Sequence, residues 1–205
     1  MSEGLRERKK AETRRALSSA ALRLAQQLGP DRVTVEAIAE AAGVSPRTFF
    51  NYFSSKDDAI LGISPSDPPD LLNDLVERPE GESPLDALRG MALRAAERLE
   101  WTADEQLARH QLTLEHPTLA SRRAARFSEI ERSLACEIAR RTGLDVNREP
   151  YPALVVGAAL AALRVGLAVW HETGRTTSMS TIIGETFDQL AAGFDVAAAR
   201  SAVPS

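Results

Sequence analysis

The 205-residue chain carries 25 Lys and Arg against 29 Asp and Glu, a formal net charge of -4, and 43% of its residues are hydrophobic. This balance excludes a chain that is disordered throughout and a fibrous protein, and it suits one or two globular domains. The single cysteine, Cys136, excludes an intrachain disulfide. Since no apolar signal segment opens the chain, we expect a cytoplasmic protein. Aromatic residues make up only 5% and alanine is abundant, so we predict an all-α fold.

Charge is distributed unevenly along the chain. Residues 1–62 hold ten basic and eight acidic side chains, a net of +2, and the remainder carries -6. Six of the ten basic residues lie between Arg6 and Arg15. This distribution is expected when one end of a molecule meets a polyanion, although a solvated helix end has the same composition.

Helical signals follow one another at the N-terminus. An apolar stripe predicts a helix over residues 5–28, which stops at Gly29-Pro30. Thr34 can cap a second helix that ends at Gly43, and Ser45-Pro46 can open a third that runs to Phe53. Residues 55–58 resemble the capping box of a fourth helix. Two short helices around a glycine form a helix-turn-helix pattern.

The rest of the chain predicts a second, larger helical domain. Prolines and glycines between residues 62 and 84 leave room only for a short helix over 70–78. One further helix is expected from Ser83, and another from a capping box at 102–105 to the break at His116-Pro117. A stripe of Phe127, Ile130, Leu134 and Ile138 predicts the next, which ends at Gly143. An apolar helix is expected to end near Glu172, and a last helix is expected to span Ile183 to Phe194. We therefore assign residues 5–62 to a helix-turn-helix DNA-binding domain, 63–195 to a ligand-binding and dimerisation domain, and 196–205 to a frayed tail.

One apolar run, residues 153–170, is long enough to suggest a membrane span. Arg164 inside it would cost about 2.5–3.5 kcal/mol at a bilayer centre, and its many alanines and glycines add little hydrophobicity. We therefore predict a buried helix and no membrane partner. Arg164 either pairs with an acid or a ligand anion inside or lies on the wet edge of the helix, which we favour.

Residues 43–56, GVSPRTFFNYFSSK, have the properties of a recognition helix. Glycine permits a tight turn, and Val44, Phe49 and Phe53 can pack inward. The side chains that can face outward are Ser45, Arg47, Thr48, Asn51 and Tyr52. An amphipathic surface helix without a DNA role would share this pattern.

This segment resembles the signature of the TetR family of bacterial transcriptional regulators. The family pattern runs valine, serine, two variable residues, threonine, an aliphatic or aromatic residue, tyrosine, a variable residue, histidine, phenylalanine, and a lysine three residues on. The resemblance covers residues 8–62, including the spacing to Thr34. Phe50 stands where tyrosine is common, which puts one phosphate hydrogen bond in doubt, and Tyr52 stands where histidine is usual.

The resemblance implies a DNA-binding site whose tasks follow from side-chain chemistry. Arg47 is expected to read a guanine edge, Thr48 to touch a thymine methyl or a phosphate, and Ser45 to cap the helix and reach a phosphate. Lys56, Tyr52 and Thr34 are expected to hold phosphates. The full predicted set is Thr34, Ser45, Pro46, Arg47, Thr48, Phe50, Asn51, Tyr52 and Lys56. Arg6, Lys9 and Lys10 can reach the flanking or minor groove, or can be solvated.

The larger domain carries no comparable motif. Its proline breaks at Pro117 and Pro152 are faintly similar to regulators that respond to fatty acyl-coenzyme A, including those linked to mycofactocin gene clusters. Candidate pocket aromatics are Trp101, His110, Phe127, Tyr151 and Trp170, for each of which ordinary core packing is the better single-residue interpretation. The three histidines lack metal-ligand spacing, so we expect neither a metal nor another cofactor.

Two classes of function remain. The first is a repressor that binds palindromic operator DNA as a homodimer and is released by a small, largely apolar effector such as an acyl-CoA. The second is a helical enzyme or binding module whose basic N-terminus is incidental. We predict no enzyme, because the sequence offers neither a nucleophile with its base nor a phosphate-binding glycine loop. The dimer is expected to form through the last two helices. Their small residues allow close helix approach: Gly157, Ala158, Ala161, Ala162 and Gly166. The residues expected to fill a bundle shared between subunits are Leu160, Leu163, Leu167, Phe187 and Leu190.

Overall fold

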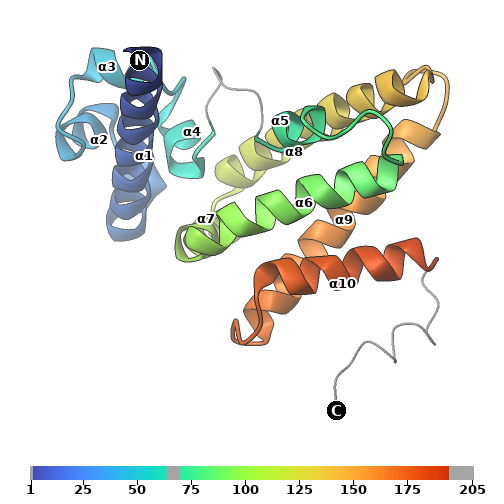
Figure 1. Ribbon diagram of the computed structural model, residues 1–205. Coiled ribbons are helices and arrows are strands. Elements are labelled where there is room, and N and C mark those ends of the chain that lie inside the picture. The colour runs from blue at the N-terminus through green and yellow to red at the C-terminus, as the bar shows by residue number, and fades with distance from the viewer. Residues whose placement is uncertain (1, 64–69, 194–205) are drawn as a thin grey trace. The chain divides into compact units, whose positions relative to one another are not determined.

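The computed structural model describes residues 2–63 and 70–193, and within these ranges the chain folds into ten α-helices and one 3₁₀ turn without a β-strand (Figure 1). The predicted all-α class is confirmed. Packing divides the chain into two compact units, which are described separately. Unit 1 comprises Met1–Pro68 and Ala103–Phe127, and unit 2 comprises Pro69–Thr102 and Ser128–Ser205. The predicted frayed tail, 196–205, lies outside the described residues.

Unit 1 is built around the long first helix. Its elements are α1 (Ser2–Leu28), η1 (Pro30–Arg32), α2 (Val35–Ala41), α3 (Pro46–Phe50), α4 (Lys56–Leu61), α7 (Ala103–Glu115) and the first part of α8 (Pro117–Thr142). Helix α1 packs against η1, α2, α4 and α7. The fully buried Leu17, Ile38, Phe49 and Ile60 fill the centre of this unit, which holds the short helices in place because none of them is long enough to be stable alone.

The packing of unit 1 reaches beyond the predicted DNA-binding domain. Ala108 and Leu112 of α7 and Leu119 of α8 join the same buried cluster as α1 to α4. The domain boundary after residue 62 stays a prediction, but the compact unit that contains the helix-turn-helix includes residues far along the chain. The predicted capping box at 102–105 is wrong, because the Thr102 hydroxyl donates backward, to the carbonyls of Arg98 (3.3 Å) and Leu99 (3.5 Å).

Unit 2 is a helical bundle with its own core. It contains α5 (Asp70–Val76), α6 (Pro84–Trp101), the second part of α8, α9 (Tyr151–Glu172) and α10 (Met179–Ala191). Helix α10 packs against α9 and α6, and α5 packs against α6; Figure 1 shows α9 and α10 side by side. The largest fully buried side chains of this unit are Phe187, Leu75, Leu88, Met91, Leu134 and Ile138.

Helix α9 buries one face and leaves an apolar face open. It is the one helix in the described part of the chain that is long and apolar enough to cross a membrane, yet only 33% of its most apolar window is buried. Leu154, Val165 and Val169 are 71%, 44% and 38% exposed. Arg164 is also exposed, which confirms its expected place on the wet edge. The helix is therefore half-buried in the chain, where full burial was predicted.

Four residues expected at a subunit interface belong to the core of unit 2. Leu160, Leu163 and Phe187 are buried within the chain itself. Gly166 lies so close to α10 that an added Cβ would stand 2.9 Å from Ile183 Cγ1. These residues hold α9 against α10 of the same chain, and their part in a bundle shared between subunits stays a prediction.

Candidate nucleic-acid interface

The helix-turn-helix is held by short-range hydrogen bonds. The Thr34 hydroxyl accepts from the Ala37 amide at 3.1 Å and caps α2. Gly43 adopts φ +69°, the left-handed conformation that a side chain disfavours, so the chain can turn between the helices. The Ser45 hydroxyl accepts from the Thr48 amide at 3.1 Å and caps α3. Both predicted caps are confirmed, and they set where each helix begins.

The inner face of this motif is apolar. Phe49 and Phe53 are 0% and 1% exposed, their ring centroids lie 5.8 Å apart, and Val44 packs partly buried against the same core. These are the three side chains predicted to pack inward. They fix the orientation of α3 relative to α1 and α4.

The outer face of the motif is polar apart from one aromatic ring. Phe50 is 61% exposed and meets Phe49 edge-on at 5.4 Å. Thr48 and Tyr52 are half-buried. The remaining outward residues are all exposed: Thr34, Ser45, Pro46, Arg47 and Asn51. Helix α3 is shorter than predicted, because Asn51 is its C-cap and the amides of Tyr52 and Phe53 turn back to the Phe49 carbonyl.

Lys56 lies differently from what the resemblance implies. Its ammonium donates to the carbonyls of Pro30 at 2.9 Å, Asp31 at 3.1 Å and Val33 at 3.0 Å. An ammonium has three N–H donors, so all of them are used within the protein. The structure thus joins Lys56 to the turn before α2.

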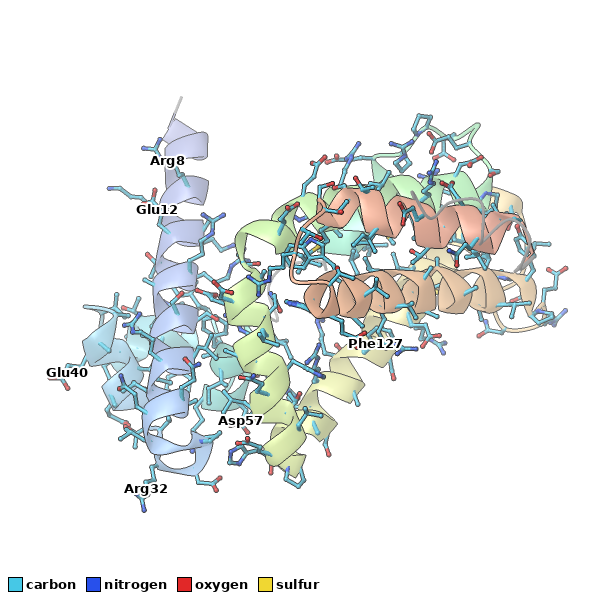
Figure 2. All side chains as sticks on the ribbon, turned by 90° about the horizontal axis from the view of Figure 1, so that it is seen from below. Arg8, Glu12, Arg32, Glu40, Asp57 and Phe127 are labelled. Atoms are coloured by element: carbon cyan, nitrogen blue, oxygen red, sulfur yellow. The ribbon has the colours of Figure 1, made fainter. Side chains whose placement is uncertain are left out.

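The basic N-terminal segment is helical from Ser2 onward. Arg8 and Glu12 pair at 3.7 Å with 70% and 63% of their side chains exposed, and Figure 2 shows both on turns of α1 that project beyond the neighbouring helices in that view. Lys9 is exposed and Lys10 half-buried. The side chain of Arg6 lies outside the described part. The basic side chains of Arg8, Lys9 and Lys10 therefore lie on α1.

Helix α4 is tied to α8 by an ion pair that sequence reasoning missed. Asp58 is 1% exposed, and Arg122 of α8 grips its carboxylate through two hydrogen bonds of 2.6 and 2.9 Å. The Asp58 amide donates to Ser55 as predicted, but the carboxylate points to Arg122. The supposed capping box is therefore only half formed.

The last turn of α4 is held from α7. Arg109, 7% exposed, donates to the Ile60 carbonyl at 3.1 Å and to the Ser18 hydroxyl at 3.1 Å. Ser18 in turn donates to the Ala59 carbonyl at 2.8 Å. Gly62 ends α4 with φ +72°, the left-handed conformation that a side chain disfavours. A cation at the C-terminus of a helix is favourable in the helix dipole.

The five candidate pocket residues are distributed over both units of the chain. His110 and Phe127 belong to unit 1 and are exposed, and the Trp101 side chain is outside the described set. Tyr151 and Trp170 stand near opposite ends of α9, about 28 Å apart at 1.5 Å per residue. Trp170 is buried and donates to the Thr177 carbonyl at 2.8 Å, a packing role. Tyr151 and Trp170 therefore cannot line one small pocket in unit 2.

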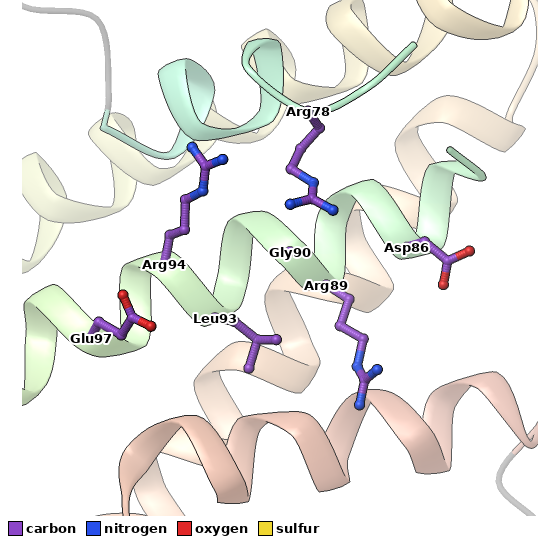
Figure 3. Close-up of a pocket in the computed structure, with 7 residues that line it drawn as sticks. All are labelled: Arg78, Asp86, Arg89, Gly90, Leu93, Arg94 and Glu97. Carbon is purple, nitrogen blue, oxygen red and sulfur yellow. The ribbon is translucent and has the colours of Figure 1, made fainter. Parts of the chain in front are cut away.

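An open groove of about 360 Å³ in unit 2 is lined mainly by charged residues. Figure 3 shows Arg78 reaching toward Gly90 of α6 while Arg89 points toward α10. Arg89 pairs with Asp188 at 2.8 Å and Arg94 with Glu77 at 2.7 Å, and Arg78 pairs with Glu82. Each of these three arginines therefore has an acidic partner.

Comparison with known proteins agrees with this geometry. Residues 17–61 match the model of the bacterial regulatory proteins of the tetR family, and residues 82–195 match that of the MftR C-terminal domain. The chain is 38% identical over 178 residues to the HTH-type transcriptional regulator TcmR of Streptomyces glaucescens, covering 82% of this chain and 77% of that protein.

Solved structures share the fold. The Thermus thermophilus repressor FadR in complex with lauroyl-CoA superposes with a TM-score of 0.52 at 23% identity, over 89% of this chain and 95% of that one. NalD of Pseudomonas aeruginosa, the secondary repressor of the MexAB-OprM multidrug efflux pump, gives 0.56 at 22% identity, over 89% and 96%. With its capped helix-turn-helix, the two matching family models and a relative at 38% identity, this chain belongs to the TetR family of DNA-binding transcriptional regulators, which are not enzymes.

Proposed function

We propose that this protein is a cytoplasmic repressor that binds a palindromic operator as a homodimer and is released by an apolar effector. One observation carries the DNA site: the outward residues of α3, with Arg47, Phe50 and Asn51 exposed, stand on a core fixed by Phe49 and Phe53. A guanidinium can donate two hydrogen bonds to a guanine edge, and an exposed ring can contact a thymine methyl or a sugar. Thr34, Ser45, Pro46, Thr48 and Tyr52 complete the proposed contact surface.

A gel shift with DNA upstream of the protein's own gene tests operator binding. We expect a retarded complex that resists unrelated competitor DNA and weakens steeply with salt, because phosphate contacts release counterions. Arg47→Ala is expected to lose about 1–3 kcal/mol of discrimination at one base position. An unchanged specificity ratio in this variant would refute the assignment of Arg47 to base reading.

We place the dimer interface on the open face of α9. Leu154, Val165 and Val169 form an apolar surface there, and a second copy related by a twofold axis would bury it. Val165→Glu is expected to give a monomer in sedimentation equilibrium at micromolar concentration. Val76→Glu, the same change at a 52% exposed valine on α5, is the matched control and is expected to remain a dimer.

The effector proposal rests on the likeness to the MftR C-terminal domain and on the fold shared with a FadR that holds lauroyl-CoA. Acyl-CoA thioesters are therefore the first class to test, followed by planar aromatics and cationic drugs. An effector at one hundred times its dissociation constant is expected to stabilise the protein by about 2.7 kcal/mol. It must also lower operator affinity, since a ligand acts only through different affinities for two conformations.

Helix α4 is the proposed path from effector to DNA. Arg122 lies on α8, which continues from unit 1 into unit 2, and it grips Asp58 of α4. A shift of α8 would therefore pull on the helix that follows the recognition motif. A thermal-shift screen followed by gel shift tests the coupling: a ligand that raises the melting temperature but leaves operator affinity unchanged would refute it.

A further inference from the structure

We propose that Lys56 is a positioning residue. It connects the start of α4 to the segment before α2 and so sets the orientation of α3 toward DNA, instead of neutralising a phosphate. This inference deepens the proposed operator binding and rests on it. The residues between Val33 and Lys56 comprise α2, the turn and α3. The hydrogen bonds of Lys56 therefore join the start and the end of the whole reading motif.

The geometry uses the full donor capacity of the ammonium. Its three acceptors, the carbonyls of Pro30, Asp31 and Val33, lie at 2.9, 3.1 and 3.0 Å. The acceptors belong to η1 and to the residue directly before the Thr34 cap. If the ammonium moved to a phosphate, these carbonyls would lose a charge-assisted hydrogen bond each.

Both ends of this connection are anchored in the core. On one side Pro30 is buried and Val33 is 2% exposed. On the other, Ala59 and Ile60 of α4 are fully buried, and Ser55 caps the helix by accepting from the Asp58 amide at 3.1 Å. Because the hydrogen bonds of Lys56 connect two segments that are held in the core, they restrict the motion of α2 and α3 between them. The loss of Lys56 would therefore increase the mobility of α2 and α3 together.

The salt dependence of DNA binding distinguishes a positioning role of Lys56 from a phosphate contact. Lys56→Met keeps most of the apolar stem and removes the charge. We expect about a tenfold loss of operator affinity, the factor that corresponds to one charge-assisted hydrogen bond. Non-specific affinity should change by less than about twofold, and the slope of log affinity against log salt should stay at the wild-type value. Loss of a phosphate contact would instead weaken all sequences and flatten the slope by about 0.9.

Lys56→Arg makes the distinction without removing charge. A guanidinium is larger than an ammonium and its donors lie in a fixed planar fork, so it does not reproduce the three hydrogen bonds of the compact ammonium at this position, but it binds phosphate at least as well. The proposal therefore predicts that Lys56→Arg also loses specific affinity, whereas a phosphate contact predicts wild-type binding. Arg23→Met, a charge loss at an exposed position of α1, is the matched control and should leave the ratio of specific to non-specific affinity unchanged.

Amide hydrogen exchange tests the tie without DNA. Residues 34–50 of Lys56→Met should exchange faster than in Arg23→Met, because the motif is no longer closed. Faster exchange together with a lost specificity ratio and an unchanged salt slope supports the proposal. Equal exchange rates, a flattened slope, or a Lys56→Arg variant with wild-type operator binding would overturn it. If the wild-type protein preferred no DNA sequence, the proposed operator binding would fail, and the exchange rates alone would decide whether Lys56 closes the motif.

Discussion

The helix-turn-helix and the α9–α10 pair are both helical surfaces, but they are organised over different sequence distances. In the first, Thr34 and Ser45 set the helix starts through amides three residues away. In the second, Gly166 of α9 matters because Ile183 of α10 lies against it. A site that depends on local capping and turn residues can be predicted from the sequence. A site that depends on packing between distant segments cannot.

The largest expected effect comes from emptying either core. Phe49→Ala should lower the free energy of unfolding of unit 1 by about 3–5 kcal/mol, because a buried ring leaves a cavity. Phe187→Ala should have a similar effect in unit 2, since both rings are at most 1% exposed. Hydrogen exchange after each substitution locates the loss: we expect it in α1 to α4 for the first and in α6, α9 and α10 for the second. A loss spread evenly over both units would contradict the division into two cores.

A smaller effect is expected at the ion pair that reaches α4. Arg122→Gln leaves the Asp58 carboxylate, 1% exposed, without its bidentate partner. We expect a loss of about 1.5–3 kcal/mol in urea unfolding, the range for hydrogen bonds to charged groups. Arg123→Gln is the control, because the Arg123 contacts to His110 and Thr113 are 3.4 Å long and exposed or half-buried. Equal losses in the two variants would show that the Asp58 contact is not special.

The features that could be predicted from the sequence are those that depend on neighbouring residues. Proline and hydroxyl caps lie next to the helix ends that they create, so the starts of α3 and α6 were predictable. The inward side of α3 was predictable too, because Phe49 and Phe53 are one helical turn apart.

The polar contacts between distant segments could not be predicted. Lys56 and the carbonyl of Pro30 are 26 residues apart, and Asp58 and Arg122 are 64 apart. Nothing in the local sequence of Asp58 distinguishes a capping carboxylate from one that binds α8. The same limit applies to the candidate aromatics, because residue type predicts burial, as for Trp170, but not which other residues share a cavity.

The two glycines of α9, Gly157 and Gly166, lie in different packing environments and test the role of tertiary packing in this region. Gly166→Ala would place a methyl group 2.9 Å from Ile183 Cγ1, so we expect about 1–3 kcal/mol of destabilisation from overpacking. Gly157→Ala meets only Glu131 Oε1 at 3.5 Å, so the higher helix propensity of alanine should stabilise the free chain by roughly 0.5–1 kcal/mol. Thermal melts of the two variants should move in opposite directions. If both destabilise the dimer but not the monomer, Gly166 would serve subunit contact after all.

The smallest expected effect is the loss of a serine N-cap, which gives a direct test because α3 and α10 share the same capping arrangement but differ in proposed role. Ser45 accepts from the Thr48 amide at 3.1 Å and Ser178 accepts from the Thr181 amide at 3.2 Å; in each case the threonine hydroxyl lies within 2.9 Å of the serine hydroxyl. Ser45→Ala and Ser178→Ala should each cost about 1 kcal/mol of stability, the typical value for an N-cap.

Operator binding should separate the two variants. Ser45→Ala alters the first turn of α3 and is expected to weaken operator affinity, whereas Ser178→Ala alters the start of α10 and should leave affinity per folded dimer unchanged. Because the local chemistry is the same, stability cannot explain a difference in binding. Equal operator affinities at equal loss of stability would mean that the α3 cap does not shape the DNA-binding surface, and the contrast between the two regions would then lie in their exposed side chains alone.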